Sequence, residues 1–287
     1  MAFIDKAHQR VAGDPHGDRP AERRGSRGGA RGFPSWVGMP RVYENRWETR
    51  IDVAGGPSWV GWVGKGLEPL ALCVGMPEPI RLYGLPPSHY CISAELMLAF
   101  KGIPFQRVYA PFHDRQELLR LSGQDYVPAL FQEGKFVPWY AIPDHLEGLH
   151  PSPTLYPRGQ KGLSRTLEHW GHQVLEDRVW KAVVTKVPPV LRSPEERWVF
   201  EEVQTRARGP WTVQEARREE FLRELKEPLA LIEEMLDGKE WLLGEPGLAD
   251  FGVYGGLSPL FTVGDSLPRG FPRTEAWTRR VQGLLPP

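Results

Sequence analysis

Residues 80–101 read IRLYGLPPSHYCISAELMLAFK, and this stretch decides the fold. Its first residues alternate between apolar and polar, which predicts a short β-strand that ends at Gly84. Two prolines then mark a turn. Ser88 follows at the position where a helix begins, and its hydroxyl can accept a hydrogen bond from a free backbone N–H there. A strand, a tight turn and a helix are therefore predicted in succession.

The predicted helix has an apolar face and a defined end. Ile92, Leu96 and Phe100 recur every four residues, and Gly102 suits the left-handed residue that closes many helices. The first turn of a helix carries free N–H groups and a partial positive charge. Ser88 therefore marks a ready site for an anion or a thiolate.

Composition limits the possible classes of protein. The 287 residues suffice for one large or two ordinary domains, and the formal net charge is zero, which gives the chain no overall bias toward nucleic acid or membranes. No apolar run approaches the ~18 residues of a membrane span. Cys73 and Cys91 are too few for a disulfide framework or a zinc cluster, so we expect no metal and a reducing, cytoplasmic location.

Residues 1–75 differ from the rest of the chain. Stretches such as RPAERRGSRGGARG have no apolar period and are rich in Gly, Pro and Arg, which is typical of a low-complexity, disordered extension. One interpretation is a basic arm that touches nucleic acid or another partner. The interpretation that we favour is an upstream extension from a misassigned start codon, with the functional protein beginning near Met76.

The chain after Met76 divides into two parts. Residues 76–157 predict the order β-α-β-α-β-β-α, which is one small α/β domain. Its strands include one from Phe105 to Tyr109 and one from Tyr126 to Phe131 that carries a proline near its start. Residues 158–287 predict helices only, including long ones over 162–184 and 212–236, the second kinked at Pro228. In a further helix, Asp250 occupies the acidic third position of a capping box.

Residues 78–284 resemble the glutathione S-transferase family. The motifs that carry this resemblance occur in the family's order: IRLYGLPPSHYC, KGIPF, YVPAL, PTLYP, WLLGEPGLADFGVYG and GFPRTEAW. The resemblance implies a thioredoxin-like domain that binds glutathione, followed by an all-α domain. It also implies a homodimer and a small electrophilic substrate, without a membrane or nucleic-acid partner.

The resemblance implies a site at the start of the first helix. Ser88 would stabilise the thiolate of glutathione, although it also fits a purely structural N-cap. Val127, held by a cis peptide bond to Pro128, would pair with the cysteinyl part of the tripeptide. In the family, an acidic residue followed by Ser or Thr binds the γ-glutamyl group after the fourth strand. This chain lacks such a pair, and Trp139 and Tyr140 occupy its place. The Tyr140 hydroxyl could replace the serine, or the two aromatic rings could fill the pocket.

Three functions compete at this point. The first is a transferase that attaches glutathione to a small apolar electrophile, with Trp170 and Trp180 contributing to the pocket wall. The second is a non-catalytic binding or scaffold protein with a degenerate glutathione site. The third is a thiol-disulfide oxidoreductase, because SHYC resembles the glutaredoxin CPYC site. It would need an exposed, acidic Cys91, whereas a buried structural cysteine is the interpretation that we favour.

Overall fold

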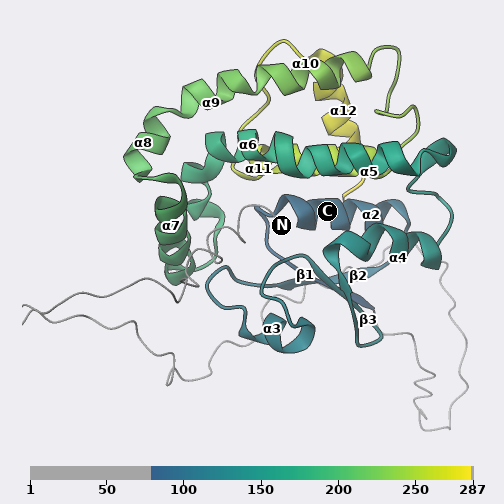
Figure 1. Ribbon diagram of the computed structural model, residues 1–287, viewed down its shortest axis with the longest axis horizontal. Coiled ribbons are helices and arrows are strands. Elements are labelled where there is room, and N and C mark those ends of the chain that lie inside the picture. The colour runs from purple at the N-terminus through teal and green to yellow at the C-terminus, as the bar shows by residue number, and fades with distance from the viewer. Residues whose placement is uncertain (1–78, 286–287) are drawn as a thin grey trace, which may run out of the picture. The chain divides into compact units, whose positions relative to one another are not determined.

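The computed structural model describes residues 79–285, and the predictions for residues 1–75 fall outside this range. The chain after residue 79 opens with a four-stranded mixed sheet in the order β2-β1-β3-β4 (Figure 1). The strands are β1 (Ile80–Gly84), β2 (Phe105–Tyr109), β3 (Ala129–Gln132) and β4 (Lys135–Pro138). β1 pairs in parallel with β2, whereas the β1–β3 and β3–β4 pairs are antiparallel. The crossover between β1 and β2 is helical, as the sequence predicted.

Three helices cover the two faces of this sheet. They are α2 (His89–Phe100), α3 (Gln116–Ser122) and α4 (Ile142–Leu149). α2 and α4 lie on the face toward the later helices, and α3 lies on the opposite face (Figure 1). The alternation along β1 explains the two layers: Leu82 joins the core shared with α2 and α4, whereas Tyr83 packs in a second cluster with Leu118 of α3. This is the thioredoxin-like arrangement that the sequence predicted.

The rest of the described chain is helical, which confirms the predicted all-α part. The helices are α5 (Lys161–Trp170), the π-helix η3 (Gly171–Leu175), α6 (Glu176–Val183), α7 (Pro194–Arg208), α8 (Trp211–Ala216), α9 (Arg218–Glu224), α10 (Lys226–Met235), α11 (Leu248–Thr262) and α12 (Pro272–Gln282). Single 3₁₀ turns η1 (Trp139–Ala141), η2 (Pro157–Gly159), η4 (Val184–Lys186) and η5 (Pro188–Val190) complete the described elements. No helix within residues 79–285 is both long and apolar enough to cross a membrane.

Helix α11 forms the centre of the core. It is buried from Leu248 to Leu260 and packs against α2, α5, η3 and α6. At its start, Asp250 accepts hydrogen bonds from the backbone N–H groups of Gly247 (3.2 Å) and Leu242 (3.0 Å), and from Nε1 of Trp277 (2.8 Å). The prediction that Asp250 caps this helix is confirmed.

Two predicted helices differ in detail. The helix over 162–184 is interrupted by the π-helix, which no apolar period reveals. The helix over 212–236 is divided into three, and the prediction that Pro228 kinks it is confirmed. The break between α9 and α10 occurs at Leu225. Pro228 has no N–H for the carbonyl of Glu224 four residues earlier, and this carbonyl accepts a hydrogen bond of 3.2 Å from Arg178 instead.

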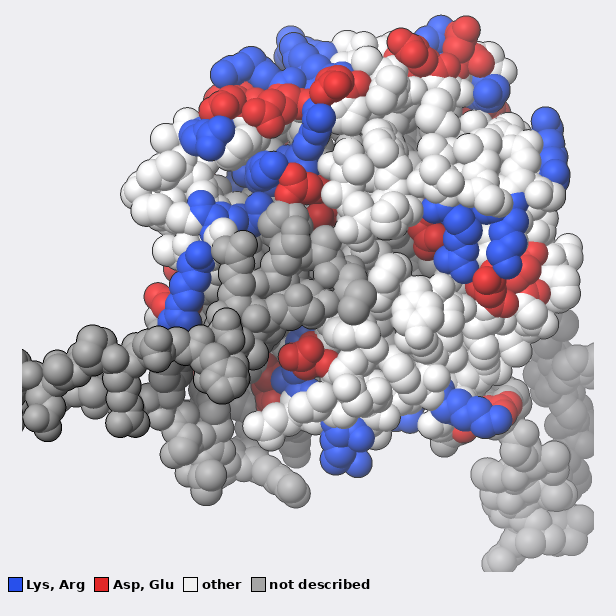
Figure 2. Space-filling view, viewed as in Figure 1, with Lys and Arg blue, Asp and Glu red and all other residues white. Residues whose placement is uncertain are grey.

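Charges of opposite sign lie together on the helical part. Along the upper edge of Figure 2, where α9 and α10 run, Lys and Arg side chains alternate with Asp and Glu side chains. Arg217 and Glu220, for example, form an ion pair of 2.9 Å. On the visible face the charges are therefore mixed and not gathered into a patch of one sign.

Candidate functional site

The strand pairing brings the predicted site segments to one edge of the sheet. Tyr83, near the end of β1, pairs with Ala129 at the start of β3, and Ala129 pairs with Pro138 at the end of β4. The turn after β1, the segment before β3 and the turn after β4 therefore emerge together. They carry Ser88, Val127-Pro128 and Trp139-Tyr140 respectively.

Ser88 is the N-cap of α2. Its backbone is extended (φ −81°, ψ 111°), and its Oγ accepts a hydrogen bond of 3.4 Å from the backbone N–H of Cys91. The side chain is half-buried. A serine hydroxyl has one donor and two acceptor lone pairs, so capping leaves its O–H available. The capping interpretation and the thiolate-stabilising interpretation are therefore compatible.

Val127 and Pro128 are buried directly before β3. The peptide bond between them is cis, as the resemblance implied. Val127 packs in the same apolar cluster as Tyr83 and Cys91, which ties it to the turn that carries Ser88.

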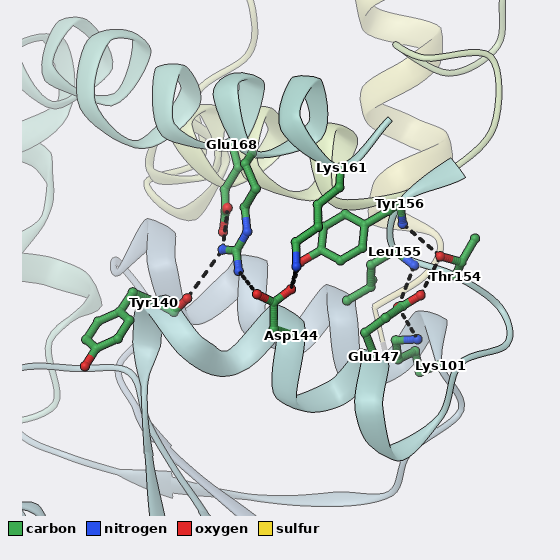
Figure 3. A network of polar contacts seen from close by, with 10 residues as sticks. Lys101, Tyr140, Asp144, Glu147, Thr154, Leu155, Tyr156, Lys161 and Glu168 are labelled. Carbon is green, nitrogen blue, oxygen red and sulfur yellow. Dashed lines mark hydrogen bonds and ion pairs between the residues drawn. The ribbon is translucent and has the colours of Figure 1, made fainter. Parts of the chain in front are cut away.

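The two aromatic residues after β4 point in different directions. Trp139 is half-buried, and its ring centroid lies 4.6 Å from that of Tyr90 in the first turn of α2. The Tyr140 side chain is 59% exposed, and its carbonyl oxygen accepts a long hydrogen bond (3.4 Å) from Arg165 (Figure 3). Trp139 therefore borders the first turn of α2, whereas Tyr140 faces outward.

Cys91 lies inside the protein. It is 1% exposed, and a Cβ atom at Gly84 would lie 2.9 Å from its sulfur. Burial raises the pKa of the thiol to about 12, so it is protonated at neutral pH. A disulfide-exchange nucleophile must be an accessible thiolate. The oxidoreductase interpretation is therefore contradicted, and Cys91 is a buried structural residue.

Three residues that the sequence did not single out face the start of α2 from the helical part. They are His172 and Gln173 of η3 and Glu176 of α6. The Tyr90 ring stacks on His172 at 4.2 Å, and its hydroxyl oxygen accepts a hydrogen bond of 2.5 Å from Nε2 of Gln173. Glu176 lies 3.6 Å from Nδ1 of His89. The spacing of four residues between His172 and Glu176 places both on one face of a helix, and this is the sequence signal that could have indicated them.

The structure describes the contacts of the two tryptophans that were expected in the pocket wall. The indole N–H of Trp180 donates to Gln204 (3.3 Å), and its ring packs against Phe200 of α7. Trp170 is half-buried and packs against the hydrophobic core that contains Leu82. Trp180 therefore joins α6 to α7.

Arg115 is a fourth residue that the sequence did not indicate. It follows β2, whose end pairs with Gly84, so it emerges at the same edge of the sheet as Ser88. Its Nε and Nη1 atoms are buried and have no hydrogen-bond partner among the described residues. Burial lowers its pKa, and the charges of Glu196 and Asp125 oppose that effect. A buried guanidinium with unused donors favours an anionic ligand.

A network of ion pairs and hydrogen bonds holds α4 against the helical part (Figure 3). Asp144 contacts Lys161 (2.8 Å), Arg165 (3.2 Å) and the hydroxyl of Tyr156 (2.5 Å). Burial alone would raise the pKa of Asp144, but these hydrogen bonds and charges hold it at about 2. This network fixes α4 against α5.

No group of three or more His, Cys, Asp or Glu residues in the described part could hold a metal ion. At the edge of the sheet that carries Ser88 and Arg115, the N-terminus of α2 and the guanidinium suit an anionic or thiol-bearing ligand.

The family model described as "Glutathione S-transferase, N-terminal domain" matches residues 82–154. A search of curated proteins finds no match. Among solved structures, glutathione transferase GSTFuA3 from Phanerochaete chrysosporium is similar, with a TM-score of 0.64 and 18% identity over 73% of this chain and 98% of that one. The chain therefore contains a segment of the glutathione S-transferase family, and its fold is that of these proteins.

Two further structures contain the tripeptide. A glutathione S-transferase of Ceriporiopsis subvermispora in complex with glutathione has a TM-score of 0.61 and 16% identity over 72% of this chain and 96% of that one. Glutaredoxin 2 from Salmonella typhimurium in complex with glutathione has a TM-score of 0.60 and 15% identity over 72% of this chain and 94% of that one. At these identities the likeness establishes the fold.

Proposed function

We propose that the protein is a glutathione-dependent transferase in which Ser88 stabilises the thiolate of glutathione for attack on a small electrophile. The observation that carries the proposal is the hydroxyl of Ser88 at the N-terminus of α2, beside the cis Val127-Pro128 segment. A thiol has a pKa of about 8.5 in water, and a hydroxyl donor together with a helix N-terminus favours its ionised form. The thiolate is the nucleophile.

The peptide part of glutathione would bind along the same edge. The Val127 backbone would pair with the cysteinyl residue as an added strand does. Arg115 would hold one of the two carboxylates of the tripeptide, because its buried Nε and Nη1 atoms lack partners among the described residues. Trp139, half-buried beside Tyr90, would border the γ-glutamyl end. Tyr140, with its exposed side chain, would contribute at most through its backbone.

The first test is isothermal titration of glutathione into the full-length protein and into Arg115→Met. A charge-assisted hydrogen bond contributes about 1.5–3 kcal/mol, so Arg115→Met should weaken binding by roughly 10- to 150-fold. Arg280→Met is the matched control, because Arg280 on α12 also has a buried Nε without a partner among the described residues, far along the chain from β1. Its affinity should equal that of the wild type.

The second test measures the pKa of the bound thiol from thiolate absorbance against pH. Ser88→Ala should raise this pKa by about 1–2 units, because it removes one hydrogen bond to the thiolate. Ser193→Ala is the control, since Ser193 also caps a helix. Its Oγ accepts a hydrogen bond of 3.1 Å from the backbone N–H of Glu196. Both variants lose a cap, and only Ser88→Ala should change the thiol.

Absence of glutathione binding at tens of millimolar ligand would refute this proposal. It would then favour the interpretation of the fold as a non-catalytic binding or scaffold protein, with Trp139 filling the missing γ-glutamyl subsite.

A further inference from the structure

The ring of Tyr90 lies between two other aromatic rings. Its centroid is 4.6 Å from that of Trp139, in the 3₁₀ turn after β4, and 4.2 Å from that of His172, in the π-helix η3. The planes of the Tyr90 and His172 rings differ by 29°. Aromatic pairs of this kind attract each other beyond the area that they bury. Because Tyr90 belongs to the first turn of α2, the stack joins this turn to the segment after β4 and to the helical part.

The hydroxyl of Tyr90 is also held by the π-helix. It accepts a hydrogen bond of 2.5 Å from Nε2 of Gln173, the residue after His172. A π-helix closes its hydrogen bonds over five residues, so consecutive side chains are turned less far apart around its axis than in an α-helix. Two neighbouring residues therefore reach the same side chain, His172 at the face of the ring and Gln173 at the hydroxyl.

The first turn of α2 depends on such contacts because its own capping is weak. The hydrogen bond from the backbone N–H of Cys91 to Oγ of Ser88 is long, at 3.4 Å, and residues 89–92 include no acidic side chain. Carboxylates in the first turn stabilise the start of a helix, and helix ends fray. The position of Ser88 and of the free N–H groups beside it is therefore set by how this turn packs against the rest of the protein.

We propose that Tyr90 is a positioning residue: through its stack on His172, the π-helix holds the first turn of α2 in the place where Ser88 faces the thiolate of glutathione. This inference rests on the proposed function. It makes the helical part necessary for activation of the thiol, although Ser88 and the free N–H groups belong to the thioredoxin-like part.

Charge offers no other route from these rings to the thiol. Burial lowers the pKa of His172 to about 3 and keeps that of His89 well below its usual value, so both rings are neutral at neutral pH. Burial raises the pKa of Tyr90, which stays protonated. The carboxyls of Glu168 on α5 and Glu176 on α6 face Tyr90 as well, and burial raises their pKa values to about 6 and about 8. Replacement of the Tyr90 or His172 ring therefore removes no charge at neutral pH and keeps both carboxyls.

The experiment measures the pKa of the bound glutathione thiol from its thiolate absorbance in full-length variants. Tyr90→Leu should raise this pKa by about 0.5–1 unit, which is part of the effect expected when the Ser88 hydroxyl itself is removed. His172→Leu leaves α2 unchanged in sequence and should raise it equally. The double variant should show the rise of either single variant, because the two rings act as one unit. Tyr90→Phe keeps the ring and should restore most of the wild-type value.

Tyr156→Leu is the matched control. Tyr156 joins α4 to α5, since its hydroxyl donates to Asp144 at 2.5 Å and its ring centroid lies 5.1 Å from Nζ of Lys161. This variant should loosen that junction without changing the bound thiol. Hydrogen exchange of residues 88–92 without ligand is a second measurement. The exchange should be faster than in the wild type in Tyr90→Leu and His172→Leu, and unchanged in Tyr156→Leu.

The outcomes separate the two proposals. An unchanged thiol pKa in Tyr90→Leu and His172→Leu, even with faster exchange, would overturn the inference, because the stack would then be structural only. Additive rises in the double variant, or an equal rise in Tyr156→Leu, would also overturn it while the transferase function stands. Should Tyr90→Leu fail to fold, the result of His172→Leu decides alone. Absence of glutathione binding by the wild type would refute the proposed function itself, and the inference with it.

Discussion

Gly171→Ala should destabilise the protein through one contact between two backbones. Gly171 begins η3 and lies against α11. A Cβ atom there would be 2.5 Å from the carbonyl oxygen of Gly252 and 2.8 Å from Cα of Val253. These distances are about 1 Å shorter than ordinary van der Waals contact, and backbone atoms cannot rotate away as a side chain does.

The magnitude follows from two opposing terms. Inserting a methyl group into a well-packed site costs about 1–3 kcal/mol, and the fixed backbone places Gly171 at or above the upper end. Alanine is about 1 kcal/mol better than glycine within a helix, which offsets part of this cost. The net loss should be about 2–3 kcal/mol, or about 1 M in the urea midpoint for an m value of 2–3 kcal/mol/M.

Gly162→Ala in α5 is the matched control, because a Cβ atom at Gly162 meets nothing within 4 Å. This variant should gain up to about 1 kcal/mol from helix propensity alone. Urea unfolding of the full-length protein, followed by circular dichroism, measures both variants. A Gly171→Ala midpoint equal to or above that of Gly162→Ala would refute the reasoning that the α11–η3 contact excludes a side chain.

Three further predictions concern charged side chains that are buried or that join two helices. The pKa of Asp144 is lower in the folded protein (about 2) than in the unfolded chain (3.8), so its stabilisation is present above pH 3.8 and is lost as pH falls toward 2. Because the side chain is about half exposed, Asp144→Asn should cost only about 1 kcal/mol at pH 6 and much less at pH 2.5; an equal cost at both would contradict this. Lys101→Met should cost about 3 kcal/mol in urea unfolding, since the fully buried ammonium pairs with Glu147 at 2.8 Å, and a neutral result would show that the pair contributes nothing. Asp250→Ala should cost about 3–5 kcal/mol because three N–H donors lose their acceptor; a loss below that of Lys101→Met would contradict this accounting.

The sequence was sufficient for features that depend on local chemistry. The turn at Gly84 and the N-cap at Ser88 follow from residue type and spacing, and so does the cap at Asp250. These features were predicted because the residues that determine them are neighbours in the chain.

Features that depend on contacts between distant segments were not predictable from one sequence. The π-helix at Gly171–Leu175 lies where two glycine-containing segments contact each other, and the periodicity of apolar residues in the sequence does not indicate such a contact. The burial of Arg115 and of Glu176 likewise depends on which helices cover them. The hydrogen bond of Trp180 to Gln204 is another such contact, because the two residues lie on different helices.

A second close contact of α11 acts together with the one that excludes a side chain at Gly171. A Cβ atom at Gly255 of α11 would lie 2.1 Å from Oγ of Ser93 on α2 and 3.1 Å from Cε1 of His172 on η3. Helix α11 therefore contacts α2 and η3 at the same glycine, and this places His172 next to the first turn of α2, where its ring stacks on that of Tyr90. A substitution that parts α11 from η3 should accordingly disturb this stacking, even though it touches neither ring.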